Sequence, residues 1–350
     1  MKNALEFYKG KKVLLTGHTG FKGAWMLVLL NQLGAEVYGI SLPPEENSLY
    51  EQINGEKLCK SEAFIDIRDR REVIRHLNFW EPDIIIHMAA QAIVQKSFEQ
   101  ALYTFQVNVE GTINLMEAIR VLQNSTITLW ITTDKVYENQ NKGIPFKETD
   151  PLGGNDPYSA SKAAMELAIK SYNFSFFKSS QHKNICLRAG NVIGGGDEAP
   201  YRLMPDIIKA WKTGEQLIIR NPESVRPWQH VLEPLTAYLL LGEKLGNAEI
   251  SLGEAFNIGP DMSENKSVRD VLNIVQKRWQ NLDWIDKKED NTFGEEARVL
   301  SLNTDKLDKT LPSRRKLTYK EAIAWTLDWY ENDKSPLEKC LKQIQEFLNN

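Results

Sequence analysis

Tyr158 and Lys162 are the residues of this 350-residue sequence whose types and spacing most directly suggest chemistry. They lie four positions apart in Asp156–Lys162, a run that predicts the start of a helix, so both side chains project from one face. A phenol has a pKa near 10, and to act as a base near neutral pH it must lose about three units, or about 4 kcal/mol. A lysine cation about 4 Å away supplies about that much at an effective dielectric constant of about 20. The pair could therefore take a proton from an alcohol, and a tyrosine stacked on a surface lysine is the structural alternative.

A second group of reactive side chains follows the strand-like run Thr128–Thr132. Thr133, Asp134 and Lys135 come directly after it, and the carboxyl ends of strands are where ligands bind in open α/β sheets. Thr133 could hydrogen-bond a substrate oxygen that is being oxidised. Asp134 and Lys135 offer an acid and a base at one site, and a polar surface turn is the alternative for these two residues.

A glycine-rich loop near the N-terminus predicts a binding site for a dinucleotide. The strand-like run Val13–Thr16 passes directly into a GxxGxxG pattern, and a predicted helix follows from Ala24. Glycines here permit a tight turn and the close approach of a pyrophosphate, which N–H groups at the start of the helix would hold. Lys22 could contact a phosphate or remain solvated, and the whole loop could be a structural turn. The residues concerned are Gly17, His18, Thr19, Gly20, Phe21, Lys22 and Gly23.

The choice between NAD and NADP is left open by the second strand-like run, Glu36–Ser41. A fold that prefers NAD usually has an acidic residue at the end of this strand, near the ribose. The run instead continues to Leu42 and Pro43, with neither a carboxylate nor an arginine at the tip. Asp66, after the third run, is a candidate contact for the adenine, and a helix N-cap is its alternative. We expect NAD as the cofactor without excluding NADP.

Short apolar runs alternate with amphipathic stretches up to residue 190, which predicts a doubly wound α/β fold with a parallel sheet. Several runs are apolar throughout, as strands buried on both faces are. We predict a dinucleotide-binding Rossmann domain over residues 1–190, with a return segment near 228–260. A smaller, mostly helical substrate domain over residues 191–350 would be interleaved with it. The strand-like runs are Val13–Thr16, Glu36–Ser41, Ala63–Ile65, Ile84–His87, Thr128–Thr132, Asn184–Arg188 and Ala255–Ile258, and the helix-like stretches are Ala24–Leu33, Asp69–Leu77, Ala101–Leu122, Ser159–Tyr172 and Leu235–Leu245.

Composition excludes several classes of function. The formal net charge is −4, so there is no global basic bias that would draw the chain to nucleic acid or to an anionic membrane. No run approaches the roughly 18 apolar residues that a membrane span needs. The three cysteines, Cys59, Cys186 and Cys340, are scattered, which predicts unpaired thiols in a reducing cytoplasm and neither disulfides nor a metal-ligand cluster.

Seven motifs together resemble the extended short-chain dehydrogenase/reductase family, and within it the nucleotide-sugar 4,6-dehydratases. The resemblance runs from about Lys11 to about Tyr330. The subgroup that acts on CDP-glucose is indicated by Lys135 after the aspartate, by His18 and Lys22 in the glycine loop, and by the last two motifs. The motifs are Gly17–Gly23, His87–Gln91, Asn108–Thr112, Thr133–Lys135, Asp156–Lys162, Arg188–Asp197 and Arg226–Val231.

The resemblance implies that the reaction is an internal redox cycle ending in dehydration. Tyr158 would remove the proton of the sugar C4 hydroxyl while a hydride passes to NAD, and Thr133 would hold that oxygen. Asp134 would protonate the leaving C6 hydroxyl. Lys135 would remove the C5 proton if it is neutral, or stabilise the enolate if it is charged. The alternatives on the same scaffold are a 4-epimerase and a dehydratase for a dTDP-, GDP- or UDP-linked sugar. A non-catalytic dinucleotide-binding regulator is the alternative from another class; it predicts a broken Tyr158–Lys162 pair, whereas the pair is intact.

Further contacts are implied by the resemblance alone. The nucleotide diphosphate would be bound by Asn191, Arg226 and Arg202, because guanidinium groups pair with phosphate oxygens, and structural salt bridging is the alternative for both arginines. His230 would be either a substrate contact or a packed histidine. The cofactor contacts beyond the glycine loop, Tyr158 and Lys162 would be Asp66, Ile67, Ala89, Ala90, Gln91 and Asn108.

The same analogy predicts the assembly. The stretches Ala101–Leu122 and Ser159–Tyr172 resemble those through which family members pair as a four-helix bundle. We therefore expect a homodimer or a higher homo-oligomer.

Overall fold

A seven-stranded parallel sheet forms the centre of the molecule in the computed structural model, which describes residues 4–140, 143–287, 300–312 and 314–349. The strand order is β11-β6-β5-β4-β1-β2-β3, and every neighbouring pair is parallel. The order reverses direction at β1, which opens a crevice at the carboxyl ends of β1 and β4. The strands are β1 (Lys12–Thr16), β2 (Glu36–Ser41), β3 (Ser61–Phe64), β4 (Ile84–His87), β5 (Ile127–Thr133), β6 (Lys183–Ala189) and β11 (Ala255–Ile258).

The predicted doubly wound fold is confirmed, and the strands agree closely with their apolar runs. The bounds of β2, β4 and β11 are those expected, because each is a short run bounded by polar or turn residues. The strand β11 also returns to the main sheet beside β6, as predicted. The expected third strand was Ala63–Ile65, whereas β3 begins at Ser61, since its partly exposed, polar first residues carry no apolar signal.

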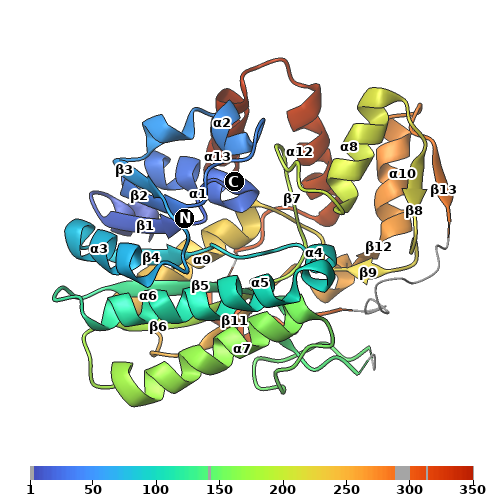
Figure 1. Ribbon diagram of the computed structural model, residues 1–350. Coiled ribbons are helices and arrows are strands. Elements are labelled where there is room, and N and C mark those ends of the chain that lie inside the picture. Colours follow the sequence, from blue (N-terminus) through green and yellow to red (C-terminus); the bar gives the residue numbers. More distant parts are fainter. Residues whose placement is uncertain (1–3, 141–142, 288–299, 313, 350) are drawn as a thin grey trace.

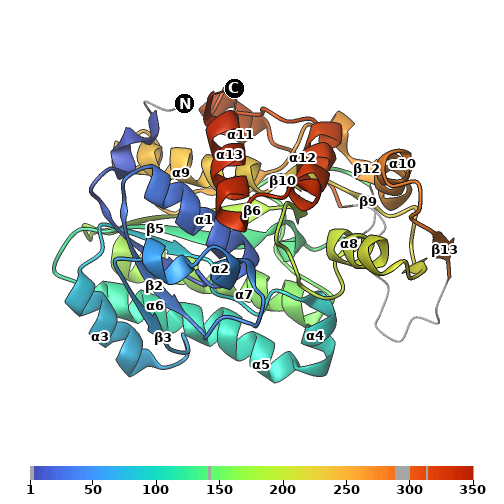
Figure 2. The same cartoon turned by 90° about the horizontal axis from the view of Figure 1, so that it is seen from above.

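Helices cover both faces of the sheet, as Figures 1 and 2 show. One hydrophobic cluster fills the space between the sheet and α1, α9 and α13, and a second fills the space beneath α3, α6 and α7. The helices of the first face are α1 (Phe21–Gln32), α2 (Leu49–Gln52), α9 (Leu232–Gly246), α11 (Asp305–Thr310) and α13 (Pro336–Asn349), and those of the second are α3 (Arg70–Trp80), α4 (Val94–Glu99), α5 (Ala101–Phe105), α6 (Gly111–Arg120) and α7 (Pro157–Tyr172).

The predicted helix Ala101–Leu122 is present over residues 101–120, with a change of hydrogen-bond pattern in its middle. A π-helical turn, η3 (Gln106–Glu110), separates α5 from α6. Gly111 follows it at a close approach, because a Cβ atom there would lie 2.5 Å from Cγ2 of Ile67. Such π-turns are frequent at functional sites, and this one carries Asn108. The 3₁₀ and remaining π segments are η1 (Ala4–Tyr8), η2 (Gly55–Leu58), η4 (Asp134–Val136), η5 (Asn173–Phe177) and η6 (Met262–Glu264).

A third hydrophobic cluster lies beside the sheet, among α8, α10 and α12, at the right of Figure 1. The chain therefore builds a separate helical layer near the strand carboxyl ends, although α13 packs against α1 on the sheet side. The division of the chain into two domains stays a prediction. None of the helices in the described residues has both the length and the apolar composition of a membrane span. The elements here are α8 (Leu203–Thr213), α10 (Val268–Arg278) and α12 (Tyr319–Glu331), with β7 (Val192–Ile193), β8 (Leu217–Ile219), β9 (Val225–Arg226), β10 (Gln229–His230), β12 (Lys266–Ser267) and β13 (Trp284–Asp286).

Candidate active site

Thr133 and Tyr158 meet at the carboxyl end of β5. Thr133 is the last residue of that strand, and its hydroxyl hydrogen-bonds the Tyr158 phenol. The same hydroxyl lies 3.1 Å from Oδ1 of Asp134 and accepts the Lys135 N–H at 3.4 Å. The helix α7 that carries Tyr158 is capped by Asp156, which accepts the Ser159 N–H at 2.9 Å. The structure thus brings the two predicted reactive motifs together.

Lys162 lies one turn along α7 from Tyr158 and is 3% exposed. Its ammonium donates to the Ile131 carbonyl at 3.3 Å, which anchors α7 to β5. Burial lowers the pKa of Lys162 to about 7, and the nearby charge of Lys22 contributes to this decrease, whereas Glu166 acts in the opposite direction. Near neutral pH this lysine is therefore close to its titration midpoint.

The electrostatics of Tyr158 differ from the expectation drawn from the Tyr158–Lys162 spacing. Burial raises the pKa of Tyr158 to about 12, although the hydrogen bond from Thr133 opposes this rise. Asp134 raises it as well, while Arg202 lowers it. Burial of both partners is the physical reason, because it disfavours the phenolate and also the lysine cation that would stabilise it. Further positive charge at the site is needed to ionise Tyr158 near neutral pH.

Asp134 is suited to act as an acid. The side chain is 2% exposed, and its Oδ2 atom has no hydrogen-bond partner among the described residues. Burial raises the pKa of Asp134, against the effects of Lys135, Thr133 and Arg226. A carboxyl group with a raised pKa is more often protonated, and it can then donate its proton to a leaving hydroxyl.

Lys22 is only partly exposed, so the solvated alternative is wrong. Burial lowers the pKa of Lys22 to about 8, with a further contribution from Arg202, while Asp134 and Asp197 act in the opposite direction. These neighbours place the ammonium between the glycine loop and the catalytic residues. A phosphate contact from Lys22 stays a prediction.

The glycine loop has the steric features of a dinucleotide cradle. Gly17 has φ +73°, and a Cβ atom there would lie 2.7 Å from the Ala89 nitrogen. A Cβ atom on Gly23 would lie 2.1 Å from the Gly17 carbonyl oxygen, so side chains at both positions would force the loop open. The helix α1 begins at Phe21 after Gly20, whose lack of a side chain leaves the first N–H groups uncapped. These residues fit a pyrophosphate at the helix start.

A second loop, which contains Ala89, Ala90 and Gln91, lies beside the glycine loop. Asn108 holds it in place, because its Oδ1 atom accepts the Gln91 N–H at 2.9 Å and its amide donates to the Gln91 carbonyl at 3.1 Å. The same amide donates to Ser161 Oγ at 2.9 Å, on α7. The predicted cofactor loop is thereby tied to the helix that carries the catalytic pair.

Asp66 is not a helix cap, because α3 is capped by Asp69, which accepts the N–H groups of Arg71 and Glu72. The Asp66 carboxylate instead accepts a hydrogen bond from Nη2 of Arg68 at 2.7 Å. The Arg68 hydrogen bonds lower the pKa of Asp66, so the group remains an anionic acceptor. A contact with adenine stays a prediction for Asp66, and also for Ile67, whose side chain is buried beneath α6.

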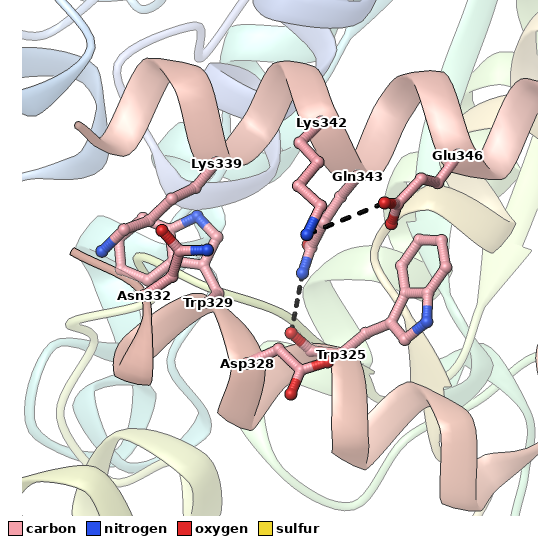
Figure 3. Close-up of a pocket in the computed structure, with 8 residues that line it drawn as sticks. All are labelled: Trp325, Asp328, Trp329, Asn332, Lys339, Lys342, Gln343 and Glu346. Carbon is pink, nitrogen blue, oxygen red and sulfur yellow. Dashed lines mark hydrogen bonds and ion pairs between the residues drawn. The ribbon is translucent and has the colours of Figure 1, made fainter. Parts of the chain in front are cut away.

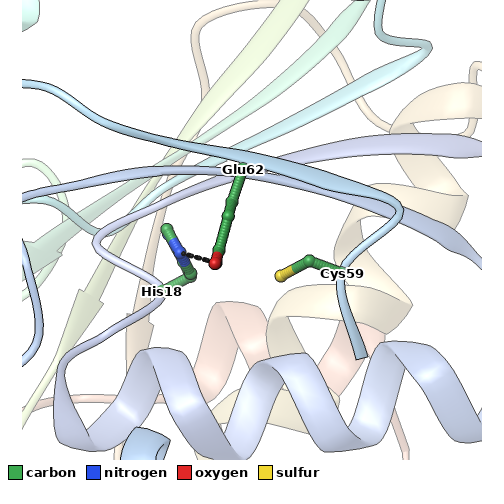
Figure 4. Close-up of side chains that lie close together, drawn as sticks. All are labelled: His18, Cys59 and Glu62. Carbon is green, nitrogen blue, oxygen red and sulfur yellow. Dashed lines mark hydrogen bonds and ion pairs between the residues drawn. The ribbon is translucent and has the colours of Figure 1, made fainter. Parts of the chain in front are cut away.

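Glu62 is a residue of the cofactor side that the sequence analysis missed. Its carboxylate, from β3, lies 3.0 Å from His18 Nε2, as Figure 4 shows, and also accepts from Tyr50 and Cys59. The ligand atoms of Cys59, His18 and Glu62 lie within 4.8 Å of one another, and the expectation that the cysteines take part in no metal-ligand cluster stays a prediction. All three side chains already take part in hydrogen bonds centred on the carboxylate. No short-range pattern could have shown this grouping, because its members come from separate elements.

The predicted substrate residues divide into two groups. Arg226 is 4% exposed and lies close enough to Asp134 to affect the pKa of that carboxyl group. The backbone carbonyl of Asn191 accepts the Gln229 N–H, which holds the segment after β6 against β10. Arg202 is 35% exposed and pairs with Asp197, its Nη1 lying 3.0 Å from Oδ2. Salt bridging therefore describes Arg202 in this structure, and its partly exposed side chain remains accessible to a ligand.

His230 does not reach the site, and its predicted substrate contact is corrected to packing. The side chain is fully buried, and its ring lies 5.9 Å from that of Trp25 and 5.6 Å from that of Trp325. Its Nδ1 atom accepts the Leu232 N–H at 3.4 Å, at the start of α9. The histidine therefore joins α1, α9 and α12 in the core.

A shallow pocket between α12 and α13 is separate from this site. Gln343 donates across it to the Trp325 carbonyl at 2.7 Å, and Lys339 lies over the ring of Trp329 (Figure 3). None of the predicted catalytic, cofactor or substrate residues lines it. The contacts within it hold the two helices together.

Comparisons with known proteins agree with this geometry. Residues 14–325 match the family described as GDP-mannose 4,6 dehydratase. The chain is 36% identical over 332 residues to a CDP-glucose 4,6-dehydratase of Salmonella typhimurium, covering 93% of this chain and 92% of that one. Among solved structures, the epimerase Mth375 of Methanothermobacter thermautotrophicus is similar with a TM-score of 0.82 at 19% identity over 97% of both chains. The UDP-glucose 4-epimerase of Thermus thermophilus, solved with NAD, gives a TM-score of 0.75 at 25% identity over 92% of this chain and 100% of that one.

Proposed function

Because this chain belongs to the GDP-mannose 4,6-dehydratase family, we propose that it converts CDP-glucose to CDP-4-keto-6-deoxyglucose with bound NAD. The resemblance to nucleotide-sugar 4,6-dehydratases is confirmed, and those relatives are hydro-lyases of the NAD-dependent short-chain dehydrogenase/reductase type. The observation that carries the proposal is the buried Asp134, with its raised pKa, beside Thr133 and Tyr158, since an alcohol dehydrogenase or a 4-epimerase has no leaving group to protonate.

The glycine loop and the loop of Ala89–Gln91 would hold the cofactor. Bound NAD would accept the hydride of C4 and return it to C6. The carboxylate of Glu62, which lies 3.0 Å from His18 of the glycine loop, disfavours an added 2′-phosphate, and the end of β2 offers no arginine to bind one. NAD is therefore the better match to these residues than NADP.

The first chemical step is alcohol oxidation at C4. Tyr158, as the phenolate, takes the proton of the C4 hydroxyl, and Thr133 orients that oxygen through its own hydroxyl. Burial alone disfavours the phenolate, so the positive charges of Lys162, Lys22 and the bound nicotinamide must together offset it.

Water elimination follows, because the 4-keto group acidifies the C5 proton. Lys135 takes this proton, and Asp134 gives its own proton to the C6 oxygen, which leaves as water. The C5–C6 double bond that forms is then reduced at C6, while the Lys135 ammonium returns a proton to C5. The cofactor ends the cycle in its starting state, so the net reaction is dehydration.

The nucleotide is tested by incubating the protein with CDP-glucose and, separately, with dTDP-glucose, UDP-glucose and GDP-mannose. We expect a 4-keto product, detected by its absorbance in alkali, from CDP-glucose at the greatest rate. A greater rate with another nucleotide would reassign the substrate. No product from any of the four would exclude the dehydratase function.

Replacement of Lys135 separates oxidation from elimination. Lys135→Ala should lower turnover by about 10²–10⁴-fold, because it removes the base at C5 but leaves Tyr158 and Thr133 in place. Reduced nicotinamide should accumulate and be visible by its near-ultraviolet absorbance. Lys170→Ala, which replaces an exposed lysine on α7, is the matched control and should behave as wild type. Wild-type turnover in Lys135→Ala would refute a chemical role for this lysine.

A homodimer is supported by exposed apolar side chains on α5 and α7, two helices that lie side by side on one face of the sheet (Figure 1). Leu102 is 74% exposed and Leu167 is 55% exposed, and a second copy of the same surface would cover both. Leu167→Glu should yield monomers in light scattering, whereas Phe79→Glu, on α3, should not. An unchanged mass for Leu167→Glu would exclude this interface.

The three free thiols of the chain fit a reducing cytoplasm.

A further inference from the structure

Glu166 continues the line of reactive side chains along α7. It lies four residues after Lys162 and eight after Tyr158, so all three project from one helical face. Glu166 is 4% exposed, and a buried carboxylate is costly unless it is paired. The hydrogen-bond partners of Glu166 therefore indicate its structural role.

The carboxylate of Glu166 joins three elements. Arg188, on β6, donates Nε to both oxygens at 3.0 Å and Nη2 to Oε2 at 2.5 Å. Thr132, on β5, donates its hydroxyl to Oε1 at 2.6 Å. Thr132 directly precedes Thr133, so this contact connects α7 to the strand end that presents the oxygen-holding hydroxyl.

Arg188 extends the same network beyond Glu166. Its Nη1 donates to the Tyr137 hydroxyl at 2.8 Å and to the Glu148 carbonyl at 3.1 Å. Tyr137 donates in turn to Asn257 on β11. The segment after Lys135 is thereby fixed to the strands below it. The network thus fixes β5 and α7, the two elements that carry the catalytic residues, to each other and to β6 and β11.

We propose that Glu166, held by Arg188 and Thr132, is a positioning residue that fixes Tyr158 and Lys162 on α7 against Thr133 on β5. A buried bidentate pair suits this role because its planar geometry allows little rotation or sliding. The inference rests on the proposed function only for the identity of the substrate, since the Tyr158–Thr133 contact is needed for any alcohol oxidation at this site.

The charge of Glu166 adds a second, measurable consequence. Among the described residues, the charged and titratable groups that interact electrostatically with Lys162 include Lys22 from α1, His87 from β4 and Glu166 from α7. Tyr158 lies one turn before Lys162 on the same helix. Burial and then Lys162 lower the pKa of His87 to about 3, so His87 is neutral near pH 7. Glu166 is therefore the anion that favours the Lys162 ammonium, and its loss must lower the pKa of Lys162 below about 7.

The test uses Glu166→Gln, which keeps the shape and the Thr132 contact but loses the charge and the paired geometry. We expect kcat to fall about 10–100-fold with KM changed less than about threefold, because a small misplacement of reacting groups affects the chemical step. The rise of kcat with pH, which reports Tyr158 ionisation, should move to higher pH. Glu166→Asp should recover part of kcat and the wild-type pH profile.

A double variant separates positioning from stability. Glu166→Gln alone leaves Arg188 as an unpaired buried charge, whereas Glu166→Gln with Arg188→Met removes both charges and should restore the midpoint of urea unfolding. If the network positions the catalytic residues, kcat stays low in the double variant. Recovery of wild-type kcat would overturn the proposal. Glu117→Gln is the matched control, because Glu117 also ties a neighbouring helix to α7, through the Tyr172 hydroxyl at 2.9 Å, and it should keep kcat.

A readout independent of the substrate uses proton uptake on unfolding. Unfolded Lys162 holds its proton up to a pKa near 10.4. In Glu166→Gln the folded lysine loses its proton at lower pH than in wild type, so near pH 7 unfolding should take up more protons than in wild type. An unchanged proton uptake would overturn the electrostatic part of the proposal, even if the wild type dehydrates none of the sugars. If the wild type forms no 4-keto product from any of the four sugar nucleotides but the difference in proton uptake is observed, only the proposed function is overturned.

Discussion

Two carboxylate–guanidinium pairs flank the catalytic residues, and they differ in exposure. In the pair of Glu166 and Arg188 both side chains are nearly sealed, at 3% and 5% exposed. In the pair of Asp197 and Arg202 the carboxylate is 4% exposed but the arginine is 35% exposed. The first pair lies behind β5 and α7, and the second lies on the substrate side near Lys22. The same type of ion pair therefore serves two purposes. The buried arginine of the sealed pair, Arg188, can only stabilise the fold, whereas the partly exposed arginine of the open pair, Arg202, can exchange its carboxylate partner for a ligand.

The largest expected effect is on stability, from breaking the sealed pair. Arg188→Met leaves the Glu166 carboxylate buried without its cation, which should reduce the free energy of unfolding by about 3–5 kcal/mol. Urea denaturation followed by tryptophan fluorescence measures this difference. A loss below about 1 kcal/mol would mean that the sealed pair is no more important to folding than a surface pair.

The comparison also shows what sequence patterns can and cannot predict. The sheet and the glycine loop were predictable, because each depends on short contiguous runs with a regular pattern. The meeting of Thr133 with Tyr158 followed only from the resemblance to the dehydrogenase family. The bond between Glu166 and Arg188 spans 22 residues, and that between His18 and Glu62 spans 44. Such pairs have no local signal, because any buried charge could in principle find several partners.

The burial of individual polar residues was equally hard to predict. His230 was a candidate ligand contact because it lies in a motif, yet it packs between two tryptophans in the core. Lys22 comes from a glycine-rich sequence that suggests an exposed loop, yet it lies in the first turn of α1, where Arg202 and two aspartates are its charged neighbours. In both cases the side chain's environment is set by elements far away in the sequence, which only the tertiary structure brings near.

A second, smaller effect concerns pH and the lysine beside the sealed pair. Folded Lys162 has a pKa of about 7, lowered first by burial, whereas the unfolded lysine keeps a pKa near 10.4. Between these values the unfolded state binds more protons, so Lys162 makes stability rise with pH from about 7 to about 10 and has little effect on the slope well below pH 7. Lys162→Met should remove up to about 1.4 kcal/mol per pH unit of this rise. An unchanged slope in urea unfolding series at about pH 7, 8 and 9 would contradict the lowered pKa.

The smallest effect on folding, and the sharpest contrast, is expected from the open pair. Arg202→Met should change the free energy of unfolding by less than about 1 kcal/mol, because its partly exposed guanidinium gains little from Asp197 in contact with water. Its effect should instead fall on substrate binding, with KM raised about tenfold, as expected for loss of one charge-assisted contact to a diphosphate. Arg202→Lys should recover only part of this, since an ammonium cannot make the planar paired contact. If Arg202→Met destabilised the fold as much as Arg188→Met and left KM unchanged, the two pairs would be alike, and exposure would not distinguish a ligand-binding arginine from a structural one.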